Sequence, residues 1–392
     1  RQDFSTVKIT VFKKNVLVFF EVLTYSIRTY CVAKRGWFTM KKLSVCVLFG
    51  GVSPEHAVSL RSAQSVLSHL DTEKYNIFPV GITQDGDWVL FGGSDYGMLP
   101  AGTWQDCPEN RRAAISPVRG QGLLSFENDC VVRERIDVVF PVLHGENGED
   151  GSMQGLLQIA GIPYVGPRVA ASAACMDKTI TKLIAGHAGI RQAAWQLVTA
   201  QDMRRGAERV AETIERALDY PVFVKPAGTG SSVGVAKARD RAALLAALET
   251  ALGYDSKVLV EEFIDGQEVE VAVLGNDTPM ASVCGEIDSG AEFYDYDAKY
   301  ILDCAKLYIP ARISEDAAEG VREQAIRVYQ AMGCRGLSRV DFFVTRDGEV
   351  VFNEINTLPG FTSISMYPKL FEASGIPYSE LLDQLIALAL ED

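Results

Sequence analysis

The chain has 392 residues, which at roughly 100 to 200 residues per domain predicts two to four structural units. Apolar residues make up 47% and charged residues 23%, so disordered, collagenous and coiled-coil classes are excluded. The net charge of −13 argues against nucleic acid and anionic membranes as partners, because an acidic surface repels both. The eight cysteines show no CxxC spacing, which favours reduced thiols and a cytoplasmic protein over a disulfide framework or a zinc site.

Residues 1–39 differ in composition from the rest of the chain, with seven Lys/Arg and two Asp/Glu. Their apolar run at 16–20 is too short to span a bilayer, and no convincing cleavage site follows it. Met40 precedes an apolar strand and looks like an ordinary cytoplasmic start. We interpret residues 1–39 as an N-terminal extension, namely upstream sequence that is translated from a misplaced start codon. A targeting or anchoring segment is the alternative.

The rest of the chain is predicted to form three units. An α/β unit over 40–165 contains predicted strands at 43–49, 75–82 and 136–143 and a helix starting at Ser53-Pro54-Glu55. A central α+β unit over 166–260 contains helices at 170–188 and 206–218 and strands at 221–225 and 233–237. A C-terminal unit over 261–392 contains a second sheet, with strands near 258–263, 268–274, 279–285, 337–344 and 349–355 and helices near 315–332 and 376–391.

A predicted hairpin over 337–355 brings polar residues together. A regular antiparallel ladder places Asp341 opposite Glu354 and Arg339 opposite Asn356, all four on one face of the sheet. Two facing carboxylates beside an amide are oxygen ligands that suit Mg²⁺ or Mn²⁺ bound to substrate phosphates. A solvated polar face is the alternative.

The apolar neighbours of these residues bear on that alternative. On a regular ladder Phe343 and Phe352 share the face of the two carboxylates, which argues against full exposure.

A glycine-rich segment, Gly228–Gly234, lies between two predicted strands. It does not fit the GxxxxGK[ST] pattern and opens no helix, so a Walker P-loop is not supported. Such a hairpin can instead cover phosphates and donate backbone N–H groups to them, with Lys225 as a nearby cation. A flexible surface hairpin is the alternative for this segment alone. Together with the acidic hairpin, it favours nucleotide chemistry.

Motifs along the chain from Met40 to the C-terminus resemble, in order, those of the D-alanine–D-alanine ligases, a family of ATP-grasp enzymes. The motifs are Gly50-Gly-Val-Ser-Pro-Glu55, His144-Gly-Glu-Asn-Gly-Glu-Asp-Gly151, Lys225-Pro226, Gly230-Ser-Ser-Val-Gly234, Glu261-Glu262, Lys299-Tyr300, Arg339-Val-Asp341, Asn353-Glu-Ile-Asn-Thr-Leu-Pro-Gly360 and Phe361-Thr-Ser-Ile-Ser-Met-Tyr-Pro368. The resemblance implies a Rossmann-like N-terminal domain, with central and C-terminal domains that sandwich ATP. Residues 1–39 have no counterpart in the family.

The resemblance also implies a reaction, namely ATP-dependent joining of two D-alanines through a D-alanyl phosphate, for peptidoglycan synthesis. It implies two Mg²⁺ or Mn²⁺ ions held by Asp341, Glu354 and Asn356. It implies contacts to ATP from Lys178, Lys225 and Lys299 at the phosphates, Ser231 and Ser232 in the glycine-rich segment, Glu261 and Glu262 at the adenine edge, and Glu268 at the ribose. The resemblance also implies a homodimer.

For the amino acids, the resemblance implies that Glu55 receives the ammonium of the first D-alanine. Arg339 and the Gly360 N–H are implied as the oxyanion hole, with Ser365 and Met366 at the carboxylate of the second substrate. His144 is implied on the second-substrate side. From its loop position alone, His144 could equally be structural or functional.

A long loop over 287–304 is predicted to close over ATP, with an aromatic surface loop as the alternative. The resemblance implies that Tyr300 bonds towards Ser231 and Glu55. Relatives that make D-alanyl-D-lactate commonly lack this tyrosine, so the motif favours the dipeptide product. Ligases using D-serine or D-lactate are the nearest rivals. A non-catalytic ATP-binding regulator is a further alternative, against which the intact metal and Arg339 motifs argue.

Overall fold

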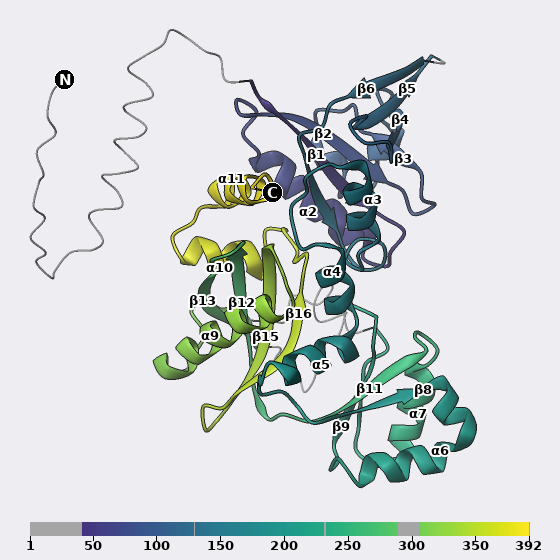
Figure 1. Cartoon of the computed structure of the whole chain (residues 1–392), viewed down its shortest axis with the longest axis vertical. Coiled ribbons are helices and arrows are strands. Elements are labelled where there is room, and N and C mark those ends of the chain that lie inside the picture. The colour runs from purple at the N-terminus through teal and green to yellow at the C-terminus, as the bar shows by residue number, and fades with distance from the viewer. Residues whose placement is uncertain (1–40, 129, 231–232, 289–305, 392) are drawn as a thin grey trace, which may run out of the picture. The chain divides into compact units, whose positions relative to one another are not determined.

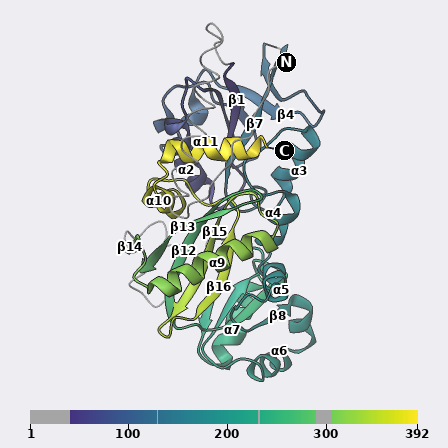
Figure 2. The same cartoon turned by 60° about the vertical axis from the view of Figure 1, so that its left-hand side comes forward.

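The computed structural model describes residues 41–128, 130–230, 233–288 and 306–391 (Figures 1 and 2). The chain separates into two units, Arg1–Lys42 and Leu43–Asp392, and the described helices and strands belong to the second. The predictions for Ser231, Ser232, Lys299 and Tyr300 fall outside the described residues. Within the second unit the described strands form three sheets, and the division into domains at residues 165 and 260 stays a prediction.

The first sheet has the strand order β6-β5-β4-β3-β2-β1-β7. Its parallel part consists of β1 (Leu43–Gly50), β2 (Tyr75–Ile82) and β7 (Val138–Leu143), which confirms the three predicted strands. These strands are rich in apolar residues because helices and loops cover both of their faces. An antiparallel extension missing from the prediction follows, with β3 (Trp88–Leu90), β4 (Arg111–Ile115), β5 (Leu123–Glu127) and β6 (Cys130–Glu134). Further elements of this region are α2 (His56–His69), α3 (Ser152–Ala160) and the 3₁₀ turns η1 (Tyr96–Met98) and η2 (Trp104–Asp106).

The predicted helix over 170–188 is in fact two helices, α4 (Val169–Met176) and α5 (Lys178–His187). Asp177 lies between them in an extended conformation, and its side chain accepts hydrogen bonds from the N–H groups of Thr179 and Ile180. The single-helix prediction was wrong because an aspartate that caps a new helix also ends the one before it.

The central sheet has the order β10-β9-β11-β8. Its strands are β8 (Trp195–Thr199), β9 (Val222–Pro226), β10 (Ala236–Ala238) and β11 (Lys257–Glu262), and α6 (Ala200–Glu215) and α7 (Arg241–Ala251) pack against it. The predicted helix start at Gly206 was wrong. Thr199 and Asp202 form a capping box that starts α6 six residues earlier, and Gly206 is a non-helical kink inside it.

The third sheet has the order β14-β13-β12-β15-β16. Its strands are β12 (Gly266–Gly275), β13 (Met280–Asp288), β14 (Lys306–Tyr308), β15 (Gly336–Thr345) and β16 (Val350–Asn356). Helix α9 (Glu315–Ala331) covers one face, and α10 (Met366–Ala373) packs against β12 and β13. The C-terminal helix is α11 (Tyr378–Ala389).

The hairpin of β15 and β16 confirms the predicted pairs, Arg339 with Asn356 and Asp341 with Glu354. The ladder is not regular beyond them, because the register shifts after Asp341 and Phe342 then pairs with Phe352. The prediction that Phe352 shares the face of the carboxylates was therefore wrong. Phe352 is fully buried and packs edge-on against Phe342, with 5.9 Å between ring centroids.

One hydrophobic core joins the two ends of the unit. Helix α11 contributes Leu382 and Leu385 to the cluster that contains Val47 and Phe49 of β1 and Leu67 of α2. Tyr75 and Lys74 both donate hydrogen bonds to Asp383 of α11. Among the described residues, no helix combines the length and apolarity needed to cross a bilayer.

Candidate active site

A cavity of about 1610 Å³ lies among the three sheets. Every predicted site residue that the structure describes lines it: Glu55, His144, Lys178, Lys225, Glu261, Glu262, Glu268, Arg339, Asp341, Glu354, Asn356, Gly360, Ser365 and Met366. These residues come from elements far apart in the sequence, and the fold brings them onto one surface. The volume of the cavity exceeds the usual range for a pocket that holds one small ligand. The cavity therefore has room for more than one ligand.

The acidic hairpin lies at this cavity with a cation already beside it. The Arg339 guanidinium pairs with Asp341 through two contacts, Nε to Oδ1 at 2.8 Å and Nη2 to Oδ2 at 2.7 Å. It also lies 3.1 Å from Oε2 of Glu270 on β12. Burial of Arg339 acts to lower its pKa, but these carboxylates outweigh burial and raise the pKa above its ordinary value. Arg339 therefore offsets part of the negative charge that faces Glu354.

Glu55 lies where two glycine loops meet. The chain turns at Gly50 and Gly51, and α2 begins at His56 with Glu55 at its N-cap position. A Cβ on Gly145 would lie 2.6 Å from Oε2 of Glu55, and one on Gly230 would lie 3.3 Å from it. The absence of side chains at these two positions lets both loops approach the carboxylate.

His144 is buried and holds a loop of the cavity wall. Its Nδ1 lies 3.1 Å from the carbonyl oxygen of Leu358, and its Nε2 lies 3.4 Å from Oγ of Ser62. A carbonyl can only accept, so Nδ1 carries the proton and Nε2 is the acceptor. Burial lowers the pKa of His144, although Glu55 raises it in part, so the ring is neutral at neutral pH.

The turn around Gly360 is equally tight. Ser62 accepts a hydrogen bond from the N–H of Phe361 at 3.2 Å. A Cβ on Gly360 would come within 2.8 Å of Oγ of Ser365, which itself accepts from the N–H of Thr362. Ser365 is the N-cap residue of α10, and Met366, its first residue, is buried. A side chain at Gly360 would therefore displace the Ser365 hydroxyl from its hydrogen bond with Thr362.

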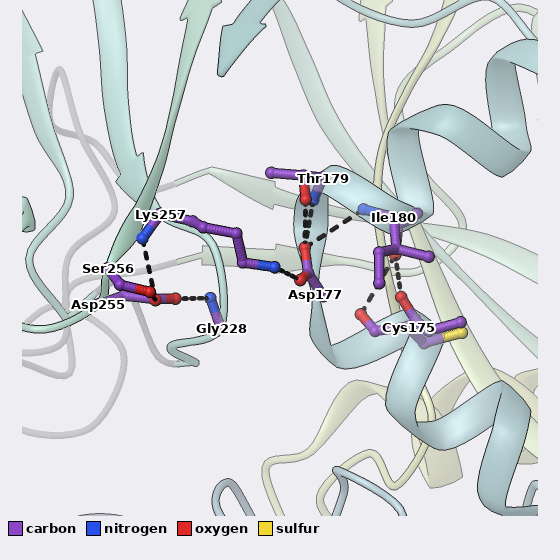
Figure 3. A network of polar contacts seen from close by, with 10 residues as sticks. Cys175, Asp177, Thr179, Ile180, Gly228, Asp255, Ser256 and Lys257 are labelled. Carbon is purple, nitrogen blue, oxygen red and sulfur yellow. Dashed lines mark hydrogen bonds and ion pairs between the residues drawn. The ribbon is translucent and has the colours of Figure 1, made fainter. Parts of the chain in front are cut away.

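Lys178 is the first residue of α5. Figure 3 shows the contacts that Asp177, the residue before it, makes at the junction of α4 and α5. Lys257 of β11 donates to Asp177, the residue that caps α5. Asp255, two residues before β11 begins, accepts from the N–H of Gly228 at 2.7 Å. Lys178 donates from Nζ to the carbonyl of Thr229 at 2.6 Å. The start of α5 and the glycine-rich segment are thus tied to the central sheet.

Glu261 is the centre of a buried charge cluster. Its Oε2 lies 2.6 Å from Nζ of Lys225, and its Oε1 lies 2.5 Å from Nζ of Lys182. Burial would raise its pKa, but the two ammonium groups outweigh burial and lower it to about 2. Burial of Lys225 acts to lower its pKa, but nearby carboxylates, Glu261 foremost, outweigh burial and raise that pKa.

The two neighbouring glutamates lie differently. Glu262 accepts a hydrogen bond from the N–H of Ala194 at 2.8 Å and lies 3.7 Å from Arg191, so its carboxylate is turned away from the two lysines. Glu268 lies near the start of β12 and contributes to the field that raises the pKa of Lys225.

The prediction missed several charged residues of this cavity, among them Lys182, Glu149 and Glu270. Lys182 follows Lys178 by four residues, and Glu270 follows Glu268 by two, so helical and strand periodicity place each beside a predicted residue. Glu149 accepts from the N–H of Gly145 at 2.7 Å. Burial and the charge of Glu55 raise its pKa to about 8.

Comparison with known proteins identifies the family. Residues 44–167 match the model of the D-ala D-ala ligase N-terminus, and residues 184–387 match that of its C-terminus. The chain is 49% identical over 363 residues to a D-alanine–D-alanine ligase of Acetivibrio thermocellus, covering 89% of this chain and 96% of the relative. It is 48% identical over 354 residues to a D-alanine–D-alanine ligase of Caldicellulosiruptor bescii, with 90% and 96% covered.

Solved structures agree with these sequence matches. The VanG D-Ala:D-Ser ligase from Enterococcus faecalis superposes with a TM-score of 0.81 at 41% identity, covering 89% of this chain and 100% of that one. The D-alanine–D-alanine ligase from Coxiella burnetii gives 0.77 at 36% identity, with 89% and 94% covered. The fold is therefore the ATP-grasp fold, as the sequence predicted. The chain belongs to the D-alanine–D-alanine ligase family, whose members are ATP-dependent ligases.

Proposed function

We propose that the chain joins two D-alanines into D-alanyl-D-alanine, at the expense of ATP, for peptidoglycan precursor synthesis. Family membership supports this activity. The main supporting observation is that one cavity is lined by four groups of residues. These are the Glu55 loop, the His144 loop, the lysines of the central region and the Arg339 hairpin. A binding module for nucleotide alone would not need the first two loops beside the acidic hairpin.

In the proposed reaction the carboxylate of the first D-alanine attacks the γ-phosphorus of ATP, and ADP leaves. The amine of the second D-alanine then attacks the carbonyl carbon of the acyl phosphate, and inorganic phosphate leaves. Glu55 binds the first ammonium. The Gly360 N–H and Arg339 stabilise the oxyanion that appears only in the tetrahedral intermediate. Ser365 and Met366 position the second carboxylate, and His144 holds the wall beside them.

For the nucleotide, we propose Lys178 and Lys225 at the phosphates, Glu261 and Glu262 at the adenine edge, and Glu268 at the ribose. From the sequence alone, Lys299, Ser231 and Ser232 join the phosphate contacts, and Tyr300 bonds towards Ser231 and Glu55.

Asp341, Glu354 and Asn356 offer an oxygen-only donor set that fits Mg²⁺ or Mn²⁺, and we propose two such ions. When bound, they neutralise charge that develops on the phosphates. Arg339 must share Asp341 with them, because it pairs with that carboxylate.

The test is ADP release with D-alanine against L-alanine, followed by product identification. D-alanine-dependent ADP release with D-alanyl-D-alanine as product supports the proposal. ADP release that does not depend on D-alanine contradicts it and favours a non-catalytic or different ATP-binding role.

A D-alanine–D-serine ligase is the second candidate, because a relative of that name matches at 41% identity. The curated relatives at 47–49% identity bear the dipeptide name, which favours D-alanine. A turnover assay offering D-alanine, D-serine and D-lactate as acceptors separates the three products.

We further propose that the enzyme is a cytoplasmic homodimer that uses neither nucleic acid nor membrane as a partner. Sedimentation of the full chain at several concentrations tests the dimer. A monomer at assay concentration would contradict it.

A further inference from the structure

One carboxylate in the cavity has two ammonium partners. Glu261 of β11 receives Lys182 of α5 at Oε1 and Lys225 of β9 at Oε2, at 2.5 and 2.6 Å. Glu354 also acts on both lysines, and Glu268 acts on Lys225, so their charge is shared among three carboxylates. Glu261 is the carboxylate that directly contacts both ammonium groups.

The two lysines differ in their surroundings. The side chain of Lys182 is 3% exposed, whereas that of Lys225 is 16% exposed. Lys225 also lies 3.3 Å from Oδ1 of Asn353, the residue that precedes Glu354 on β16. Lys225 therefore reaches towards the acidic hairpin, while Lys182 is enclosed with Glu261.

Oε1 of Glu261 also has acceptor capacity to spare. Apart from their ion pair, neither this oxygen nor Nζ of Lys182 has a hydrogen-bond partner in the part of the chain that the structure describes. A carboxylate oxygen can accept more than one hydrogen bond. Because Oε1 is buried and held by Lys182, the acceptor nearer the cavity is Oε2, the oxygen that Lys225 contacts.

We propose that Lys182 is the permanent counter-ion that keeps Glu261 ionised and oriented to accept the 6-amino group of adenine, whereas Lys225 exchanges Glu261 for the phosphates when nucleotide binds. This inference rests on the proposed function in one respect, that ATP occupies this cavity. It makes Lys182 a positioning residue that acts through Glu261 on the choice of base.

The physical reason is the state of Glu261 after Lys225 has left. Without Lys182 the buried carboxylate would then have no compensating charge, and it would take up a proton. A protonated carboxyl can donate, which suits the 6-oxo group of hypoxanthine, whereas an ionised one only accepts, which suits the 6-amino group of adenine. Lys182 therefore favours adenine over a 6-oxo purine.

The experiment measures binding of the β,γ-imido analogue of ATP and of the matching inosine analogue, by calorimetry without D-alanine. We expect Lys182→Met to weaken the adenine analogue about tenfold or more, the scale of a lost charge-assisted hydrogen bond, while the inosine analogue changes less than threefold. Lys182→Arg should restore most of the preference. Lys225→Met, the matched contrast, should weaken both analogues to a similar degree and keep the preference.

A second variant guards against misfolding of Lys182→Met. Lys182→Met combined with Glu261→Gln removes the uncompensated charge, and we expect its base preference to equal that of Glu261→Gln alone. An unchanged adenine preference in Lys182→Met, with only a lower Tm, would overturn the inference and leave Lys182 a structural residue. Additive losses in the double variant would also overturn it, because Lys182 would then act independently of Glu261.

Failure of the proposed function gives a different pattern. A chain that shows no D-alanine-dependent ADP release, but loses its adenine preference in Lys182→Met, would refute the ligase activity and support the role of Lys182. A chain that releases ADP with D-alanine, but discriminates bases equally well in Lys182→Met, would do the reverse.

Discussion

Arg339 holds Asp341 by two parallel contacts of 2.8 and 2.7 Å from two residues away on the same strand. Facing carboxylates such as Asp341 and Glu354 repel each other unless a cation lies beside them. The guanidinium supplies that charge from within the chain. The hairpin can therefore fold before any divalent cation binds.

Removal of divalent cations should leave the fold intact. We expect the Tm of the nucleotide-free protein in excess EDTA to lie within about 2 °C of its value in Mg²⁺, since ΔΔG values below about 0.5 kcal/mol shift Tm by that amount. Differential scanning calorimetry checks this. A large drop in Tm with EDTA would mean that the metal, not Arg339, holds the hairpin.

Glu354→Gln should act on chemistry more than on folding. It keeps the size of the side chain but removes the charge opposite Asp341, so we expect ADP release to fall at least a hundredfold while Tm without Mg²⁺ holds or rises. Glu349→Gln on the same hairpin is the control, because Glu349 is about half exposed and pairs with Arg191. Near-normal turnover in Glu354→Gln would remove this residue from the metal site.

Glu149→Gln should change how stability depends on pH. The pKa of Glu149 is raised from 4.5 to about 8, so between these values the folded protein keeps a proton that the unfolded chain has lost. Stability therefore falls as pH rises through this window, and it falls no further above about pH 8. We expect Glu149→Gln to flatten this loss, with a gain over the unmodified protein that grows from pH 5 to pH 8 to a few kcal/mol at most, on the order of 1.4 kcal/mol per pKa unit.

Urea unfolding at several pH values measures this difference. Glu146→Gln in the same loop is the control, since Glu146 is exposed. Parallel pH profiles for the unmodified protein and Glu149→Gln would show that Glu149 is ionised in the folded state.

Ser62→Ala should loosen the turn beside Gly360. It removes the acceptor of the Phe361 N–H and the partner of His144, so we expect a loss of about 1–3 kcal/mol in unfolding free energy, the scale for an orphaned buried donor. The KM for the second D-alanine should rise more than the KM for ATP, because we propose that the turn lines the amino-acid side. Urea unfolding and initial rates test both, with exposed Ser68→Ala on the same helix as the control. Equal rises in both KM values would contradict a local effect.

A chain that begins at Met40 should be as active and as stable as the full chain. The described core begins with β1 at Leu43, and residues 1–39 match neither family model. Specific activity and Tm of the two chains decide the point. Loss of folding on removing residues 1–39 would assign them a structural role.

The hairpin could be predicted from the sequence only in part. Asp341 pairs with Glu354 as predicted, but nearer the turn Phe342 pairs with Phe352, one position away from the partner that a regular ladder gives. The shift after Asp341 could not be predicted, because it arises when Phe352 turns into the core against Phe342. The break at Asp177 was missed because the flanking residues are all compatible with one continuous helix. Lys182 was missed because its partner, Glu261, lies 79 positions away, and only the folded chain brings them together.

The placement of α11 has a consequence for synthesis of the chain. Strand β1 is among the first parts of the unit to leave the ribosome, yet Leu382 and Leu385, which complete its core cluster, are translated after every described strand. The first sheet can form its parallel strands early, but one of its apolar faces stays uncovered until α11 has been made. A nascent chain that pauses before Tyr378 presents that face to chaperones and to other nascent chains.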